Sequence, residues 1–257
     1  MLTHPLLPKL KRLRLSGMLD TLDMRAKAAH EKGLSPVEFL ALLLDDEFDR
    51  RQQAGFRLRI QEAGLDEGKT LARFDFSLCG KATKNLLSDL ALCRFFDPPE
   101  NLLFVGPTGT GKSHLAQGLA FEAIKKGHRA LFRPTHHVLT ALQAGRADGS
   151  YHRLRARLIH VDVLILDDFG LVPLTAQQVE DLYELIRERY EKSPIILTSN
   201  RAPTEWGEVF GNPLLAAAAV DRLTHHSMII ELTGDSFRQR HRTKEGKGKP
   251  QLQVENE

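Results

Sequence analysis

The sequence predicts an α/β protein whose main domain is a parallel sheet covered by helices, preceded by a smaller all-helical domain. Two observations support this. From Asn101 to about Leu232 short apolar segments alternate with helical ones, whereas residues 5–65 show helical spacing only. Such alternation is typical of a parallel sheet with helices on both faces. Apolar residues make up 42% of the 257-residue chain and charged residues 27%, which excludes a largely disordered protein.

Composition also excludes several classes of protein. The two cysteines, Cys79 and Cys93, are too few for a disulfide scaffold or a cysteine-rich zinc ribbon, and they favour a reducing compartment. No apolar stretch approaches the ~20 residues that a membrane-spanning helix needs, and no secretory signal is recognised. We therefore expect a cytoplasmic protein with no membrane partner.

The helical domain is expected to cover residues 1–65. An apolar stripe at Leu15, Leu19 and Leu22 predicts its first long helix. The segment from Ser35 to Glu38 has the pattern of a capping box with proline at the first helical position, so a second helix is predicted to begin there. The apolar face of this helix is expected to comprise Val37, Leu40, Ala41, Leu44 and Phe48.

The rest of the chain is divided into a linker (residues 66–99), a core (100–242) and a disordered polar tail (243–257). In the linker a helix is expected from Lys81 to Phe95, ended by the two prolines that follow. The core strands are expected at Asn101–Val105, Ala130–Arg133, Val161–Leu166, Pro194–Thr198 and Met228–Leu232. Its helices are expected at Ser113–Lys126, His136–Ala144 and Ala176–Glu191.

A phosphate-binding motif lies between the first core strand and the helix after it. Residues 106–113 match G-x-x-x-x-G-K-[ST], in which backbone N–H groups surround phosphate oxygens. Lys112 is expected to reach the β- and γ-phosphates, and the Ser113 hydroxyl to bind Mg²⁺. The candidate nucleotide-binding residues are Gly106, Pro107, Thr108, Gly109, Thr110, Gly111, Lys112, Ser113 and His114.

Two further strands end in polar side chains. Asp167 and Asp168 follow a buried strand, and Asn200 follows the next one. Alone, either segment could be a polar turn after a strand. With the phosphate loop upstream, we expect Asp167 to hold Mg²⁺, Asp168 to act as the general base that orients the attacking water, and Asn200 to lie beside the γ-phosphate.

These three motifs, in this order, resemble the AAA+ division of P-loop ATPases, and the paired aspartates resemble its helicase-loader branch. More specifically, residues 106–116, 164–170 and 221–226 resemble IstB-type transposition helper ATPases, and the similarity covers nearly the whole chain. The resemblance implies ATP as the nucleotide. It also implies that Arg222 is an arginine finger offered to a neighbouring subunit. Arg238 matches the sensor-2 arginine, although it could equally belong to the basic tail and contact DNA.

The resemblance implies three partners: further copies of this chain, double-stranded DNA and a cognate transposase. Contacts to DNA are expected to be mainly to the backbone and salt-dependent. The candidate DNA-contacting residues are Lys9, Lys11, Arg12, Arg14, Arg146, Arg153, Arg155 and Arg157. Two alternatives stay open. One is a replicative helicase loader of the DnaC type, which would prefer single-stranded DNA. The other is a nucleotide-gated DNA-binding scaffold with slow hydrolysis, because Asp168 is shorter than the usual glutamate.

Two remaining features are expected to be structural. His136-His137 and His225-His226 are adjacent pairs, and adjacent side chains diverge in both helices and strands, so no metal site is expected at either. Trp206 is expected to pack between a loop and the core.

Overall fold

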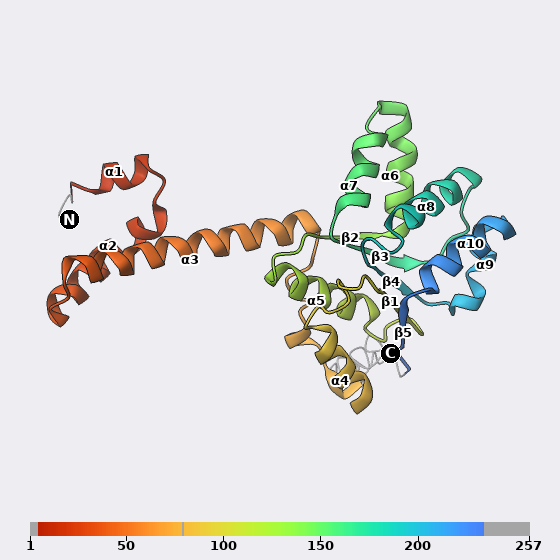
Figure 1. Cartoon of the computed structure of the whole chain (residues 1–257), viewed down its shortest axis with the longest axis horizontal. Coiled ribbons are helices and arrows are strands. Elements are labelled where there is room, and N and C mark those ends of the chain that lie inside the picture. Colours follow the sequence, from red (N-terminus) through yellow and green to blue (C-terminus); the bar gives the residue numbers. More distant parts are fainter. Residues whose placement is uncertain (1–4, 79, 234–257) are drawn as a thin grey trace, which may run out of the picture. The chain divides into compact units, whose positions relative to one another are not determined.

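The computed structural model describes residues 5–78 and 80–233. The chain forms two compact units that divide between Gln61 and Glu62 (Figure 1). Among the described residues, none of the helices combines the length and the apolar character needed to cross a bilayer.

The N-terminal unit is built from helices α1 (Leu7–Arg12), α2 (Ser16–Lys32) and most of α3 (Pro36–Ala63). α3 begins with the predicted capping box: the Glu38 N–H donates to Ser35 Oγ (3.3 Å), and the Ser35 N–H donates to Glu38 Oε2 (2.7 Å). A small core holds the helices together and contains Met18, Leu22 and Leu43, with Leu7, Leu10, Leu15 and Phe39 packed around it.

The prediction of which residues form the buried apolar face of α3 is wrong. All five residues assigned to it are exposed, with Val37 at 77% and Phe48 at 62%. The face that packs against α2 instead contains Leu43 and Glu47, because Glu47 accepts a 2.6 Å hydrogen bond from the backbone N–H of Gly17. A carboxylate that satisfies a buried helix N–H sets the rotation of α3, and a count of apolar residues alone does not detect it.

The C-terminal unit contains the predicted parallel sheet, with strand order β2-β3-β4-β1-β5. Its strands are β1 (Asn101–Val105), β2 (Ala130–Pro134), β3 (Val163–Phe169), β4 (Ile195–Ser199) and β5 (Ser227–Glu231). All the pairings are parallel. The strands agree with the predicted ones to within a residue or two, except that β3 starts later and runs through both aspartates.

The C-terminal unit also contains several helices that begin within it. They are α4 (Lys81–Leu90), α5 (Lys112–Lys125), α6 (Thr135–Asp148), α7 (Tyr151–His160), α8 (Ala176–Arg189), α9 (Gly207–Phe210) and α10 (Pro213–Thr224). Single 3-10 turns lie at Leu71–Arg73, Phe76–Leu78 and Pro203–Glu205. α4 ends before the predicted Phe95, and helices α7, α9 and α10 are not predicted. In α7, Leu158 is buried and Tyr151, Leu154 and Ile159 pack partly buried against the core, so this helix has an apolar side among its basic residues.

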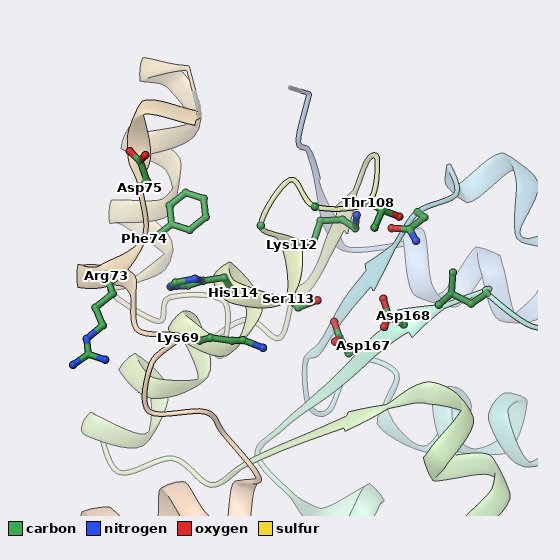
Figure 2. Close-up of a pocket in the computed structure, with 14 residues that line it drawn as sticks. Lys69, Arg73, Phe74, Asp75, Thr108, Lys112, Ser113, His114, Asp167 and Asp168 are labelled. Atoms are coloured by element: carbon green, nitrogen blue, oxygen red, sulfur yellow. The ribbon is translucent and has the colours of Figure 1, made fainter. Parts of the chain in front are cut away.

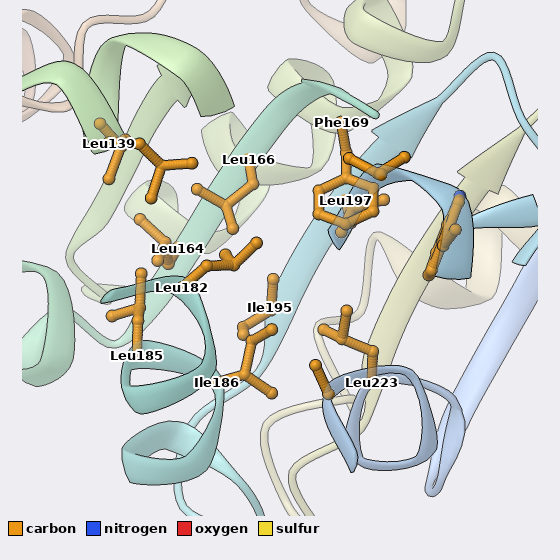
Figure 3. Packing of buried hydrophobic residues seen from close by; sticks show 14 of the residues in the cluster. Leu139, Leu164, Leu166, Phe169, Leu182, Leu185, Ile186, Ile195, Leu197 and Leu223 are labelled. Atoms are coloured by element: carbon orange, nitrogen blue, oxygen red, sulfur yellow. The ribbon is translucent and has the colours of Figure 1, made fainter. Parts of the chain in front are cut away.

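The packing of the core on both faces of the sheet explains why the strands have continuous apolar sequences. Leu164 and Leu166 of β3 point into a cluster that includes side chains from α6, α8 and α10 (Figure 3). The alternate residues Val163 and Ile165 are also fully buried, and α5 packs against β1 to β4. A strand buried on both faces needs apolar side chains at every position. Trp206 is fully buried against Phe169, as expected, with the ring centroids 4.9 Å apart.

Arg189, at the end of α8, is buried to 1% exposure inside this unit. Burial lowers the pKa of its guanidinium to about 10. Its N–H groups donate to the carbonyl oxygens of Leu158, Ile159, Val161, Asp162 and Pro194. These bonds connect α8 to the last turn of α7, to the segment between α7 and β3, and to the residue that precedes β4.

Candidate nucleotide-binding site

A pocket of about 600 Å³ opens at the carboxyl ends of β1, β3 and β4. This is where ligands bind in open parallel sheets. Figure 2 shows the lysine of the phosphate loop and both aspartates facing it. The predicted site residues that line the pocket are Thr108, Gly109, Gly111, Lys112, Ser113, His114, Asp167, Asp168 and Asn200.

The loop between β1 and α5 follows a path that requires glycine. Gly106, Gly109 and Gly111 have φ values of 139°, 87° and 94°. A Cβ on Gly111 would lie 2.6 Å from the Phe74 ring, and one on Gly106 would lie 2.2 Å from the Leu232 carbonyl oxygen. Side chains at these positions would therefore be both strained and obstructed. The remaining motif residues Gly106, Pro107 and Thr110 do not line the pocket and instead shape the loop, since Thr110 Oγ1 donates to the Pro107 carbonyl (2.9 Å).

The Lys112 side chain is held inside the loop. It is only 5% exposed, and its Nζ donates to the carbonyl oxygens of Gly106 and Pro107, both at 2.7 Å. These acceptors place the ammonium group within the curve of the loop, at the N-terminus of α5. A phosphate that enters the loop offers this ammonium charged oxygens in place of neutral carbonyls.

The end of β3 departs from regular strand geometry, and this departure places both carboxylates. Leu166 pairs with Leu197 and Phe169 pairs with Ser199, so Asp167 and Asp168 together lie opposite Thr198. Asp168 adopts the left-handed region, with φ 54°. In a regular strand, neighbouring side chains point to opposite faces, whereas a bulge redirects one of them. Here the bulge lets both aspartates line the same pocket.

Thr198 connects the two aspartates and was not predicted as a site residue. It is fully buried; its hydroxyl donates to Asp167 Oδ1 (2.5 Å) and accepts from the Asp168 backbone N–H (3.0 Å). The Asp167 carbonyl accepts from Thr135 Oγ1 at 2.9 Å. The one available signal in the sequence is a threonine at the end of an otherwise apolar strand.

A second group of lining residues comes from the segment assigned to the linker: Lys69, Arg73, Phe74 and Asp75. Phe74 packs edge-on against His114, with ring centroids 5.3 Å apart, and His114 Nε2 lies 2.9 Å from the Thr70 carbonyl oxygen. Figure 2 shows this segment on the opposite side of the loop from Asp167 and Asp168. Sequence analysis missed these residues because they carry no motif and reach the pocket only through the fold.

Of the two arginines assigned to the nucleotide, Arg222 was predicted to act in a neighbouring copy and is among the described residues. Arg222, on α10, does not line the pocket; its Nη1 donates to the Ala218 carbonyl (2.8 Å). Its guanidinium carbon lies 5.4 Å from the Tyr183 ring centroid and 6.0 Å from that of Tyr190. Arg238 is outside the described residues.

Of the eight candidate DNA-contacting residues, three make internal contacts. Arg146 pairs with the buried Asp181 carboxylate, Arg155 lies 3.6 Å from Glu184, and Arg157 donates to the Glu62 carbonyl (3.1 Å). The other five are exposed: Lys9, Lys11, Arg12, Arg14 and Arg153. DNA binding by any of them stays a prediction.

The chain is similar over most of its length to proteins of insertion sequences. Residues 8–245 match the family described as IstB-like ATP binding protein. A protein from Mycobacterium tuberculosis, described as an ATP-binding protein in an insertion sequence, is 40% identical over 91% of this chain and 93% of its own length. An ATP-binding protein of insertion sequence IS21 from Pseudomonas aeruginosa is 35% identical over 95% of this chain and 92% of its own.

Several solved structures share the fold. The DnaC helicase loader matches with a TM-score of 0.54 and 22% identity, over 65% of this chain and 98% of its own. DnaI matches with a TM-score of 0.56 and 21% identity, over 64% and 90%. DnaA from Aquifex aeolicus, bound to AMPPCP, matches with a TM-score of 0.55 and 24% identity, over 71% and 56%. The expected α/β fold of the AAA+ class, with helices preceding the sheet, is thereby confirmed.

Proposed function

The chain belongs to the family of IstB-like ATP-binding proteins, and from this premise we propose that its pocket binds and hydrolyses ATP with Mg²⁺. We further propose that the protein assembles on double-stranded DNA and acts as the helper of an insertion sequence's transposase. One observation carries the ATPase proposal: the glycine loop, Lys112, Ser113 and both aspartates line a single pocket. The names of the relatives support the connection to an insertion sequence.

The residues of the pocket fit a triphosphate and its metal ion. Backbone N–H groups of the loop and Lys112 would bind the phosphates. The Ser113 hydroxyl and the Asp167 carboxylate supply hard oxygen ligands of the kind that Mg²⁺ prefers, and Thr198 holds that carboxylate in place. The bound ion would neutralise charge on the phosphate oxygens.

Asp168 is proposed as the general base. The bulge turns its carboxylate into the pocket next to Asp167, where it can accept a proton from a water molecule. Asn200 lines the same pocket and would position that water through its side-chain amide.

The nucleotide base is proposed to lie on the side formed by Lys69 to Asp75. With the γ-phosphate toward Asp167 and Asp168, the rest of the nucleotide extends to the opposite side of the loop, where Phe74 offers an aromatic surface (Figure 2). Aromatic contacts of this kind bind any base, so they favour a nucleotide without selecting adenine.

Arg222 is proposed to complete the site of a neighbouring copy. It does not line the pocket of its own chain, which agrees with a role across an interface. A cation near the γ-phosphate in the transition state can contribute ~10³ to 10⁵ in rate. Hydrolysis would then require an oligomer.

Two substitutions test the ATPase proposal. Lys112→Ala should abolish ATP binding, measured by fluorescent-nucleotide titration, because the loop loses its phosphate-binding cation. Arg222→Ala should retain the wild-type ATP affinity but lose turnover by about a thousandfold or more. Normal ATP affinity in Lys112→Ala would refute the proposed site, and full turnover by Arg222→Ala would refute the shared one.

The DNA partner is tested separately. In the presence of ATP, binding to double-stranded DNA should exceed binding to single-stranded DNA and weaken steeply with salt. A preference for single strands would instead support the helicase-loader alternative. ATPase rates with and without DNA distinguish an ATPase from a nucleotide-gated scaffold.

A further inference from the structure

Three potential metal ligands meet at the end of α10, outside the nucleotide pocket. Glu191 follows α8, and His225 and His226 connect α10 to β5. One ligand atom from each of the three lies within 4.8 Å of the other two, the only such group of histidine, cysteine or acidic residues among the described parts of the chain. All three side chains are exposed, so an ion could reach them from solvent.

The backbone leaves regular helix and strand geometry at two of these three residues. His226 has φ 50° and Glu191 has φ 56°, so both are in the left-handed region. The reason for expecting no metal site was that neighbouring side chains diverge in regular helices and strands, and at this turn that reason does not apply. The two imidazole rings lie with their centroids 4.0 Å apart at an angle of 63°, about as close as those of His136 and His137, so the third ligand, Glu191, is what distinguishes this turn. Left-handed non-glycine residues carry a conformational cost, which gives a reason to look for a function.

The distances suit a small tetrahedral ion. Two ligands of one zinc ion, each at about 2.0–2.2 Å, lie about 3.4 Å from each other. His226 Nε2 and Glu191 Oε1 are 3.4 Å apart. His225 Nδ1 lies 2.6 Å from the Tyr190 hydroxyl. If this Nδ1–H donates to the hydroxyl, the lone pair of Nε2 is left for a metal, as is usual for metal-bound histidines.

We propose that Glu191, His225 and His226 bind a divalent transition-metal ion of the zinc class, with Tyr190 supporting His225. Two imidazoles and one carboxylate suit such ions, whereas Mg²⁺ and Ca²⁺ prefer oxygen ligands throughout. The bound ion would fix the residues after α8 to the turn after α10. Tyr190 would transmit this constraint, because its ring lies 5.9 Å from the His225 ring and 6.0 Å from the Arg222 guanidinium.

Zinc binding to the full-length, tag-free protein without nucleotide tests the proposal. Isothermal titration with Zn²⁺ should show a site in the wild type that is lost in the double variant His225→Ala/His226→Ala. The matched control is His136→Ala/His137→Ala. It removes the other adjacent pair, whose rings are equally close at 4.1 Å but which belongs to no ligand group of this kind. This control should bind Zn²⁺ as the wild type does.

Conservative variants keep the test independent of folding. Glu191→Gln, which retains the shape of the side chain, should weaken Zn²⁺ binding by at least about tenfold. Tyr190→Phe should weaken it by about tenfold through loss of the supporting hydrogen bond. Unchanged Zn²⁺ affinity in both the histidine double variant and Glu191→Gln would overturn the proposal, as would equal loss in the His136/His137 control.

The proposal of a metal site does not depend on the ATPase proposal. Lys112→Ala should bind Zn²⁺ normally even though its phosphate loop is disabled. Failure of ATP binding in the wild type would leave the titration result unaffected, and failure of Zn²⁺ binding would leave the ATPase proposal unaffected.

Discussion

Thr198 contacts both aspartates of the pocket, Asp167 at its carboxylate and Asp168 at its backbone. Its hydroxyl donates to the side chain of Asp167 and accepts from the backbone of Asp168. A threonine on β4 therefore acts on the site only through residues of β3. We regard it as a positioning residue and not as a catalytic one.

Thr198→Val tests this role because it removes the hydroxyl and keeps the shape. The Asp168 N–H and the Asp167 carboxylate lose a buried partner, so the free energy of unfolding should fall by about 1–3 kcal/mol. The Mg²⁺ concentration for half-maximal ATPase activity should rise, while nucleotide affinity without Mg²⁺ stays unchanged. Thr198→Ser retains the hydroxyl and should behave as the wild type. An unchanged Mg²⁺ requirement in Thr198→Val would show that the threonine only stabilises the fold.

Single residues also show which parts of the site can be predicted from the sequence. Lys112 and Asp167 were found because each belongs to a local pattern attached to a strand end. Thr198 and Phe74 were not, because their importance comes from contacts with residues distant in the sequence. His225 and His226 meet Glu191 only through the fold, because Glu191 is distant from them in the sequence.

Among the elements, α3 shows where hydrophobic periodicity fails. The helix start at Pro36 was predicted correctly from its capping box, yet the buried face was wrong because Glu47 and Asp46 bind groups of α2. The core strands were predicted well, since apolar runs buried on both faces carry a strong signal. Helix α7 was not predicted although Leu154, Leu158 and Ile159 pack against the core, because basic residues separate most of its apolar residues in the sequence.

The ion pair between α2 and α3 predicts how the N-terminal unit responds to acid. The Arg25 side chain hydrogen-bonds Asp46 at 2.6 and 2.8 Å and lowers the pKa of that carboxyl from 3.8 to about 2. A lowered folded-state pKa stabilises the unit above about pH 4, and this contribution is lost as the pH falls toward 2. Asp46→Asn should therefore destabilise these helices at neutral pH and remove that part of the pH dependence.

Two spectroscopic signals distinguish the unfolding of the two units in the full chain. Trp206 is the single tryptophan and lies in the C-terminal unit, whereas circular dichroism reports helices of both. In urea titrations, Asp46→Asn should shift the dichroism transition and leave the Trp206 fluorescence transition unchanged. Asp49→Asn, an exposed carboxyl on the same helix, serves as the control and should shift neither. An Asp46→Asn protein with the wild-type pH dependence would contradict the role of the pair.

For the whole molecule, the proposal that Arg222 acts in a neighbouring copy predicts that an isolated chain hydrolyses ATP poorly, because Arg222 does not line the pocket of its own chain. Lys112→Ala retains the arginine, whereas Arg222→Ala retains the phosphate loop. If the sites form between copies, mixing the two inactive variants should restore part of the wild-type ATPase rate, because one offers its arginine to the other's nucleotide. The measurement is turnover as a function of mixing ratio, with each variant alone as the control. A mixture as inactive as its components would place the arginine's role within a single chain.

The bulge at the end of β3 has a consequence for how this protein can change. Two residues face one on β4, and the second of them adopts a backbone conformation that glycine would accept more readily. A glycine at position 168, or a strand one residue shorter, would relax the sheet and at the same time remove a carboxylate from the pocket. Substitutions at this strand end that raise the stability of the fold are therefore expected to lower the proposed ATPase activity.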